Sequence, residues 1–296
     1  MGLTKTLRYI LNHPLNRPHR VAAMKRFVNW QFGSRMVPGA VLIDWVDDAK
    51  MMIRPGDHGL TGNIYCGLQE FEDMSYLLNV TTPEDLFIDV GANAGAYSIL
   101  ACKARGAKGH CYEPVPSTFE TLKSNLNVND LAEQVKAMNV GIADKEGTLR
   151  FHSDLNCENR VLAEGENPSN SIDVPVHSLD SLLEGLNPTI LKVDVEGFEG
   201  AVVEGADSVL SNPSLHSIII ELRGHGAKFG FDEDAVLKKL LDYGFSSREY
   251  DPFTRDLRNL NGLNTEVGNT LLTRNEDLVM SRLEQADKIT VNGHTY

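Results

Sequence analysis

From residue 86 onwards, short apolar runs alternate with stretches of helical spacing, and this alternation limits the folds open to the chain. The runs typical of buried strands are 86–90, 108–113, 135–142, 189–195 and 216–222. The stretches with helical spacing are 95–105, 117–127, 198–210 and 233–243. Strands that alternate with helices in this way build a mostly parallel sheet with helices on both faces. The sequence therefore predicts an α/β fold.

Local signals define some of the boundaries. Ser117 is followed by Glu120 three residues later, the spacing of a capping box, which predicts a helix start there. Gly244 follows the apolar stripe of 233–243 and predicts the end of that helix. The segment 147–179 interrupts the alternation with two strand-like runs around a polar loop. We expect it to be an insertion over the edge or mouth of the sheet.

Composition excludes several classes of protein. The 296 residues are 42% apolar and 23% charged, which is typical of a globular chain and excludes disorder as the main state. We find no apolar run near the roughly 20 residues of a membrane span and no secretion signal at the start, so we expect a cytoplasmic protein. The four cysteines show no metal-ligand spacing and are interpreted as reduced thiols. The net charge of -13 argues against nucleic acid as a partner.

The amino-terminal segment differs from the rest of the chain in charge. Residues 1–43 contain seven Lys and Arg side chains and no acid, so the remainder carries a net charge of -20. Apolar residues recur at helical spacing on both sides of Pro14 and Pro18, which predicts two basic amphipathic helices. The proposed stripes are Leu3, Leu7, Ile10 and Leu11, then Val21, Met24, Phe27 and Val28. Packing on the chain's own acidic body is the favoured interpretation, and attachment to a membrane surface or an acidic partner is the alternative. Residues 41–55 predict a hairpin that turns at 47–49.

The strongest chemical signal is the glycine turn after the first strand, where Asp89 is followed by Gly91, Asn93 and Gly95. The glycines allow a sharp turn and close approach of a ligand to the backbone. A dinucleotide fingerprint would have a glycine in place of Asn93. The carboxylate of Asp89 would repel a pyrophosphate but suits an ammonium group, such as the methionine end of S-adenosylmethionine. A dinucleotide-dependent oxidoreductase is therefore the disfavoured alternative.

The next two strands end in further candidate ligands for a cofactor. Glu113, followed by Pro114, comes 24 residues after Asp89, where a carboxylate can accept hydrogen bonds from both ribose hydroxyls of either cofactor. Gly141 to Asp144 follow the third strand, where the adenine edge would lie. Asp144 is either an acceptor for the adenine amine or part of a polar hairpin turn, and the sequence leaves both open.

The fourth strand carries Lys192, Asp194 and Glu196, which strand geometry would place on one face. Three charged side chains on a central strand predict a cleft, although a structural pair of lysine and carboxylate is the alternative. Asp194, Glu196 and His225 are the candidate bases for an acceptor hydroxyl. A metal bound by Asp194 and Glu196 would lack a third ligand, so we predict no metal site.

Taken in order, these motifs resemble the FkbM-type S-adenosylmethionine-dependent methyltransferases. The resemblance covers about residues 50 to 275 and rests on DVGANAGAYS, CYEPVPSTFETLKSNL, GIADKEGTLRF, SLDSLL, LKVDVEGFEGAVVEGA and IIIEL. It implies a class I methyltransferase fold with seven strands and O-methylation of small hydroxylated molecules, often sugars or natural-product intermediates. It also implies that the residues from Asp89 to Gly95 surround the methionine part, that Glu113 holds the ribose, and that Asp194 and Glu196 lie beside the methyl group. Tyr65, Glu70 and Tyr97 are further candidates for the cofactor site.

The sequence thus predicts three parts, an amino-terminal extension over 1–55, a methyltransferase domain over 56–275 and a tail over 276–296. A cofactor-binding protein without catalysis remains a third functional alternative. The identity of the acceptor and the oligomeric state, including a homo-oligomer, stay open.

Overall fold

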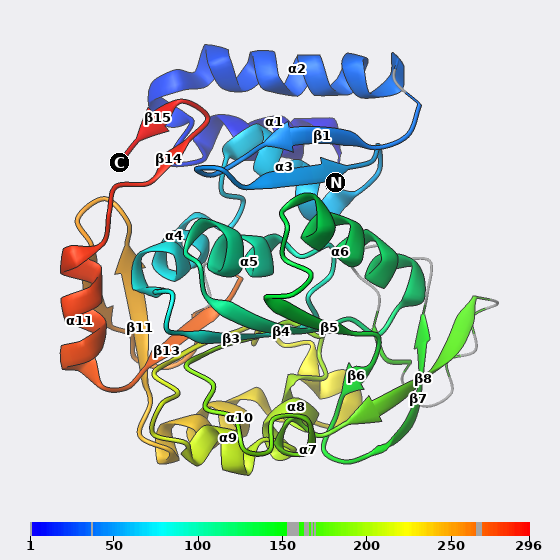
Figure 1. The fold of residues 1–296 in the computed structure, drawn as a ribbon, viewed down its shortest axis with the longest axis vertical. Coiled ribbons are helices and arrows are strands. Elements are labelled where there is room, and N and C mark those ends of the chain that lie inside the picture. The colour runs from blue at the N-terminus through cyan, green and yellow to red at the C-terminus, as the bar shows by residue number, and fades with distance from the viewer. Residues whose placement is uncertain are drawn as a thin grey trace.

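The structure is a computed structural model that describes residues 2–36, 38–152, 160–162, 166, 168, 170–264 and 268–296. Its centre is a sheet of eight strands, which confirms the predicted α/β class (Figure 1). In spatial order the strands are β12 (Asp256–Asn259), β11 (Ser246–Asp251), β13 (Thr270–Thr273), β10 (Ser217–Ile220), β9 (Ile190–Val193), β3 (Leu86–Val90), β4 (Lys108–Tyr112) and β5 (Val135–Met138).

The sheet is parallel from β10 to β5, and β13 runs antiparallel to both of its neighbours. The resemblance implied seven strands, and the eighth is β12, which extends the edge by pairing antiparallel with β11. Since four neighbouring parallel strands all end at one edge, the segments that follow β3, β4, β9 and β10 meet there.

Helices cover both faces of the sheet (Figure 1). One face carries α4 (Phe71–Val80), α5 (Ala96–Ile99) and α6 (Pro116–Val128), and the other carries α7 (Leu179–Leu182), α8 (Glu199–Glu204), α9 (Asp207–Ser211) and α10 (Glu233–Asp242). The helix α11 (Glu276–Gln285) packs beside α4. Successive strand residues alternate between the two cores: Phe87 belongs to one and Ile88 to the other. This alternation follows from the period of two along a strand.

The predicted third strand over 135–142 is confirmed only as far as Met138, where the chain leaves the main sheet. The Asn139 amide donates hydrogen bonds to the backbone carbonyls of Glu113 and Pro114, at 2.8 and 2.9 Å. The chain then enters a separate three-stranded sheet of β6 (Gly141–Ile142), β8 (Ser171–His177) and β7 (Gly147–His152). The predicted insertion is confirmed as the antiparallel pair β7 and β8, and much of its polar loop lies outside the described residues.

The helix-boundary predictions have mixed outcomes. Gly244 follows α10 with a φ of 87°, which confirms it as the terminator. The capping box is wrong: α6 begins at Pro116, whose fixed φ suits a first helical position, and no side chain caps it. The predicted helix 198–210 is split at Gly205, where a Cβ would overlap the carbonyl oxygen of Ala143.

The amino-terminal segment forms a layer outside the helices of one sheet face (Figure 1). It contains α1 (Leu3–Asn12), α2 (Arg20–Met36), the predicted hairpin of β1 (Val41–Asp44) and β2 (Lys50–Ile53), and α3 (His58–Cys66). The carboxy-terminal hairpin of β14 (Thr290–Val291) and β15 (His294–Thr295) lies against it, with Val291 bridged to Val46. None of the helices in the described part of the chain has the length and apolarity that a membrane crossing requires.

The inner face of α2 packs on α3, but the predicted stripe is only partly right. Phe27 is buried and its ring contacts Tyr65 edge-on at 5.2 Å, whereas Val21 and Val28 are exposed. The buried face instead runs through Ala23, Phe27, Trp30 and Ser34. Arg26 strengthens this contact, since its guanidinium donates to the Tyr65 carbonyl at 2.9 Å.

The prediction that the cysteines are reduced thiols can be compared with the structure at three of the four residues. Cys66, Cys102 and Cys111 are buried free thiols, and Cys157 lies outside the described residues. Burial raises the pKa of the Cys66 thiol to about 12, so this side chain behaves as a packing group.

The two faces of α2 predict opposite responses to one substitution. Phe27→Ala should lower the free energy of unfolding by about 3 kcal/mol, because it opens a cavity between α2 and α3. Phe32→Ala is the matched control on the same helix, where the side chain is 70% exposed against 9% for Phe27. It should change stability by less than about 0.5 kcal/mol in urea denaturation. Equal losses for both variants would contradict the packing described here.

Candidate active site

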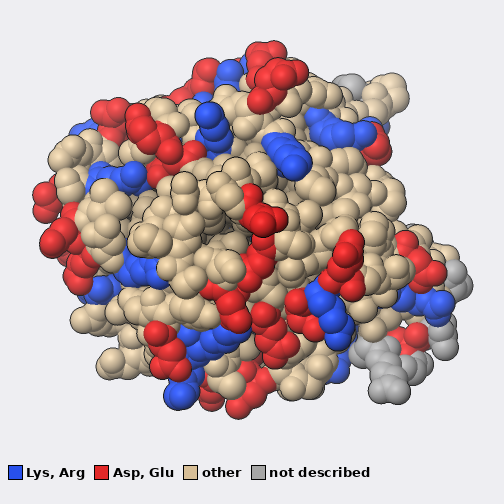
Figure 2. Space-filling view, turned by 60° about the horizontal axis from the view of Figure 1, so that its bottom comes forward, with Lys and Arg blue, Asp and Glu red and all other residues tan. Residues whose placement is uncertain are grey.

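A pocket of about 340 Å³ lies at the edge of the sheet where β3, β4, β9 and β10 end. Many of the residues singled out from the sequence line it: Glu70, Asp89, Gly91, Asn93, Tyr97, Glu113, Pro114, Lys192, Asp194 and Glu196. They come from four separate parts of the chain, and the sheet topology brings them together. Asp and Glu side chains are numerous near the centre of one face of the molecule (Figure 2).

The glycine turn after β3 is shaped by its neighbours in the fold. Gly91 has a φ of 78°, and a Cβ there would overlap the carbonyl oxygen of Asp194. At Gly95 a Cβ would lie 2.7 Å from the Leu122 side chain. Asn93 has a φ of 50°, a left-handed conformation that asparagine tolerates better than most residues. The glycines are therefore needed first for close packing of chain segments, and this packing also keeps the pocket floor free of side chains.

Glu113 joins the turns that follow β3 and β4. One carboxylate oxygen accepts from the Asn93 amide and the other from the Val115 amide, both at 3.0 Å. Burial raises the Glu113 pKa to about 7, although the hydrogen bonds from the Asn93 and Val115 amides lower it. A carboxylate oxygen can accept more than one hydrogen bond, so this group holds the turn and still offers acceptor positions toward the pocket.

Asp89 is buried beneath the same turn. Its carboxylate accepts from the Ser98 hydroxyl at 2.5 Å. Burial raises the Asp89 pKa to about 6, and this hydrogen bond lowers it only in part. The position of Asp89 is fixed by α5, because Ser98 belongs to that helix.

Lys192 is fully buried and forms an ion pair with Asp194 at 3.0 Å. Its ammonium also donates to Asn269 at 3.1 Å and lies 5.1 Å from the centre of the Tyr97 ring. Burial lowers the Lys192 pKa, but Asp194 and Glu70 outweigh burial and raise it above its usual value. Lys192 and Asp194 thus form the pair of lysine and carboxylate that the sequence analysis gave as an alternative to a cleft. Both residues also line the pocket.

The wall opposite Lys192 comes from α4 and α5. The Tyr97 hydroxyl donates to Glu70, and Asn269 donates to the buried Asp73 at 2.8 Å. Burial raises the Asp73 pKa to about 7, and Glu70 raises it further. These contacts link the wall of the pocket to the Lys192 ion pair through Asn269.

Glu196 reaches the pocket from a tight turn after β9, so the predicted strand alternation does not place it. It has a φ of 55°. The buried carboxylate of Glu199 accepts from the Val195 and Gly197 amides at 2.9 and 3.2 Å. Burial raises the Glu199 pKa to about 8. Glu199 therefore positions the turn that presents Glu196, a role that the sequence analysis missed.

Five predicted residues do not line this pocket. Tyr65 belongs to α3 and packs against Phe27 of α2, where its hydroxyl accepts from Gln31 at 2.8 Å, outside this pocket. Asp144 forms an ion pair with Lys145 in a polar turn between β6 and β7. The turn is not the hairpin of the alternative, because β8 lies between these two strands. Gly95 starts α5, and Gly141 lines a small apolar cavity that also contacts Gly91 and Pro114. His225 is exposed, with its ring nitrogen 3.7 Å from Glu196.

Glu221 and Arg223 are pocket residues that sequence reasoning did not select. They follow β10 and form an ion pair at 2.9 Å, with Glu221 mostly buried and Arg223 about half exposed. Burial raises the Glu221 pKa to about 7, and the neighbouring Asp194 raises it further. The sequence does contain a signal for these two residues, because charged side chains follow directly after the apolar strand at Glu221-Leu222-Arg223.

Glu196, Glu221 and His225 also form a group of possible metal ligands. Their ligand atoms all lie within 4.8 Å of one another. The sequence analysis considered a metal bound by Asp194 and Glu196 and found no third ligand. The group in the structure keeps Glu196 and combines it with Glu221 and His225 instead of Asp194.

Comparison with known proteins identifies the family. The model of the methyltransferase FkbM domain matches residues 89–247, which is more than half of the chain. The chain belongs to the FkbM methyltransferase family. The match begins near the end of β3, continues past β10, and includes the glycine turn, Glu113 and the segment from Lys192 to Glu199.

Relatives of this FkbM family member include two curated methyltransferases. The hexuronic acid methyltransferase AglP of Haloferax volcanii is 29% identical over 213 residues, which are 70% of this chain and 74% of AglP. Methyltransferase sdnD of Sordaria araneosa is 27% identical over 171 residues, which are 46% of this chain and 66% of sdnD. A solved FkbM methyltransferase from Methylobacillus flagellatus aligns with a TM-score of 0.45 and 12% identity, over 75% of this chain and 61% of that one. The chain thus spans between 61% and 74% of the length of these three proteins.

The buried carboxyl groups of this FkbM family member predict an unusual pH dependence. Asp73, Asp89, Glu113, Glu199 and Glu221 all have raised pKa values, so the folded state binds more protons than the unfolded state between about pH 4 and 8. The free energy of unfolding should therefore fall as the pH rises through this range. Each group that loses its proton only in the unfolded state contributes up to about 1.4 kcal/mol per pH unit.

Denaturant unfolding of the ligand-free protein at pH 5.5 and 7.5 measures this difference. Glu199→Gln should reduce the difference, because an amide cannot ionise but can still accept from the two turn amides. Glu204→Gln, an exposed position on the same helix, is the control and should leave the difference unchanged. A free energy of unfolding that rises between pH 5.5 and 7.5 would contradict the raised pKa values of the buried carboxyl groups.

Proposed function

We propose that this protein is an S-adenosylmethionine-dependent O-methyltransferase that acts on a hydroxyl group of a small molecule. The observation that carries the proposal is the charge of the pocket. Six carboxyl groups line it, and the two cations among its lining residues, Lys192 and Arg223, are each paired with one of them. The six are Glu70, Asp89, Glu113, Asp194, Glu196 and Glu221.

This charge discriminates between cofactors. A pyrophosphate would bring two negative charges among these carboxylates and would find no unpaired cation among the described lining residues. S-adenosylmethionine carries a sulfonium and an ammonium group, both of which such a pocket attracts. When bound, it supplies an electrophilic methyl group. Within this proposal Asp89 faces the ammonium end, Glu113 accepts from the ribose hydroxyls, and Asp194 lies near the sulfonium.

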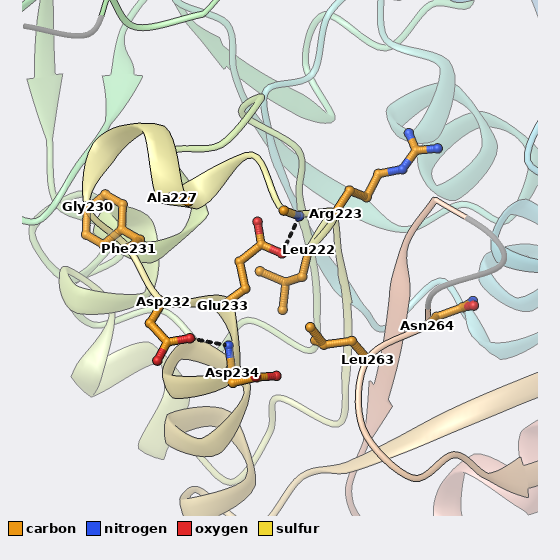
Figure 3. A pocket seen from close by; sticks show the side chains of 11 residues that line it. Leu222, Arg223, Ala227, Gly230, Phe231, Asp232, Glu233, Asp234, Leu263 and Asn264 are labelled. Atoms are coloured by element: carbon orange, nitrogen blue, oxygen red, sulfur yellow. Dashed lines mark hydrogen bonds between the residues drawn. The ribbon is translucent and has the colours of Figure 1, made fainter.

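A larger pocket of about 770 Å³ adjoins the first and shares Arg223 with it (Figure 3). Leu222, Phe231 and Leu263 give it an apolar wall, and Asp232 and Asp234 lie on its rim. The Glu233 carboxylate fixes the adjoining loop, because it accepts from the Gly224 amide at 2.6 Å and the Gly226 amide at 2.9 Å. This arrangement suits a hydroxylated ring, with an apolar wall for its face and carboxylates for its hydroxyls.

We assign the acceptor to this second pocket. The half-exposed guanidinium of Arg223 lines both pockets. One of its nitrogens is bound to Glu221, and its other N–H donors can form hydrogen bonds with a carboxylate on the acceptor. The name of the relative AglP, a hexuronic acid methyltransferase, supports including acidic sugars among the acceptors to be tested. A natural-product intermediate with the same groups would fit the same pocket.

Methyl transfer to an alcohol requires correct positioning and removal of the hydroxyl proton. Two carboxylates are suited to different parts of this task. Asp194 is held by its ion pair with Lys192, so its charge stays near the reacting end of the cofactor. Glu221 has a pKa of about 7, close to the value at which a general base works best at neutral pH. Glu221 therefore joins Asp194 and Glu196 as a candidate base.

Glu113→Ala should weaken binding of both S-adenosylmethionine and its demethylated product by tenfold or more. Each lost hydrogen bond to a charged acceptor costs on the order of 1.5 to 3 kcal/mol. Titration calorimetry measures both affinities, with NAD as the comparison ligand that should not bind. Glu120→Ala, at an exposed acid on α6, is the control. Unchanged affinity in a folded Glu113→Ala protein would remove the ribose assignment.

Asp194→Asn should lower kcat by at least tenfold while changing cofactor affinity much less, because the charge acts at the reacting end of the ligand. A panel of neutral and acidic sugars provides the acceptor for the assay.

Glu221→Gln should abolish the rise of kcat/KM near pH 7 if Glu221 takes the proton of the acceptor hydroxyl. Near-normal turnover with an unaltered pH profile in both variants would show that these carboxylates are structural.

A further inference from the structure

The outer face of α2 has no use in methyl transfer and carries an unusual pattern. Val21, Lys25, Val28, Phe32 and Arg35 follow one another at steps of four and three residues, so they form one row along the helix. All five are exposed, as is Met36 at the end of the row. In Figure 1 α2 is the outermost layer, with α1, α3 and the β1–β2 hairpin between it and the sheet helices.

This exposure is large for apolar side chains. Val21 is 85% exposed, Phe32 70% and Met36 82%. The opposite side of the same helix buries Phe27 and Trp30 against the body. The helix therefore has one apolar face that the fold covers and a second, mixed apolar and basic face that it does not cover.

The positive charge of this layer is not neutralised by the acidic body. None of the ion pairs formed among the described residues includes any of the seven basic side chains of residues 1–43. Arg17, Arg20 and Arg35 donate to backbone carbonyls within the amino-terminal segment, which leaves their charge in place. The two ion pairs that join the layer to the body among the described residues instead use acids of the hairpin turn, Asp47 with Arg105 and Asp48 with Lys103.

We propose that the outer face of α2 binds the surface of an anionic lipid membrane. Apolar side chains alternating with Lys and Arg along one helix face are suited to the boundary between headgroups and acyl chains, where both kinds of side chain are satisfied together. Anionic lipid complements a segment that has seven positive charges and no negative one.

The charge distribution also sets the orientation on the membrane. The remainder of the chain carries a net charge of -20 and is repelled by an anionic surface, so only the amino-terminal layer can approach it. A two-fold dimer through the same row would bring Lys25 and Arg35 of both copies into one interface in which the row supplies no acid, which argues against a second copy as the occupant. The proposal does not depend on the identity of the cofactor or acceptor.

Co-sedimentation of the full chain with vesicles tests the proposal. The protein should sediment with vesicles containing phosphatidylglycerol and not with pure phosphatidylcholine, and high salt should release it. Lys25→Gln combined with Arg35→Gln should weaken binding roughly thirtyfold, because each cation near an anionic surface contributes about a fivefold factor. Phe32→Ser combined with Met36→Ser should weaken it at least fivefold.

The matched control lies on α10, on the opposite face of the sheet (Figure 1). There Leu241→Ser combined with Lys238→Gln alters an exposed apolar and an exposed basic residue, and vesicle binding should not change. Thermal unfolding checks that every variant is folded. Equal binding to neutral vesicles, or no effect of the α2 variants, would overturn the proposal. Self-association or polyglutamate binding that the α2 variants abolish, without vesicle binding, would assign the face to a second copy or an acidic protein instead.

Discussion

The close approach of two parallel strands at their carboxyl ends is the constraint on which the site depends. β3 and β9 are neighbours, and the turns that follow them touch where Gly91 meets the carbonyl of Asp194. Any side chain at Gly91 would push these turns apart. Because they stay in contact, Asp89, Asp194 and Glu113 line one pocket although more than 100 residues separate the first two.

Bringing so many acids together has an energetic consequence. A buried carboxylate is costly unless it is paired or hydrogen-bonded, and among the described residues that line the pocket only one cation is fully buried, Lys192. Burial raises the pKa values of Glu113, Glu199 and Glu221, and too few cations lie nearby to lower them again. A cationic ligand would relieve it, so the features that destabilise the ligand-free pocket are those that would favour a sulfonium. Stability and binding are therefore opposed at this site.

The amino-terminal layer shows a different use of charge. Among the described residues its Lys and Arg side chains form no ion pair with the acidic body. Within the layer, Phe27 and the hydrogen bond from Arg26 to the Tyr65 carbonyl hold α2 to α3, and Asp47 and Asp48 pair with Arg105 and Lys103 of the body. Residues 1–43 carry seven positive charges and the rest of the chain a net charge of -20, and this uneven distribution gives the molecule a preferred orientation in the field of a charged surface.

The sequence by itself determined the α/β class, most strand positions, the glycine turn and the carboxylates at the strand ends. These depend on local patterns: an apolar run predicts a buried strand, and a polar residue directly after it lies at the strand end wherever the sheet is placed. Glu113 and Asp194 could be found for this reason. Tyr65 could not be excluded, because α3, to which it belongs, meets α2 only through tertiary packing.

Tertiary structure alone decided which residues meet. Glu221 and Arg223 reach the pocket because β10 pairs with β9, and Glu199 matters because it binds the amides of a turn whose shape is set by contact with Gly91 and His225. It also decided which face of α2 is buried, since helical periodicity shows that apolar residues share a face but not which face another element covers. Contacts between residues distant in the chain depend on the packing of whole elements, and a local pattern does not encode them.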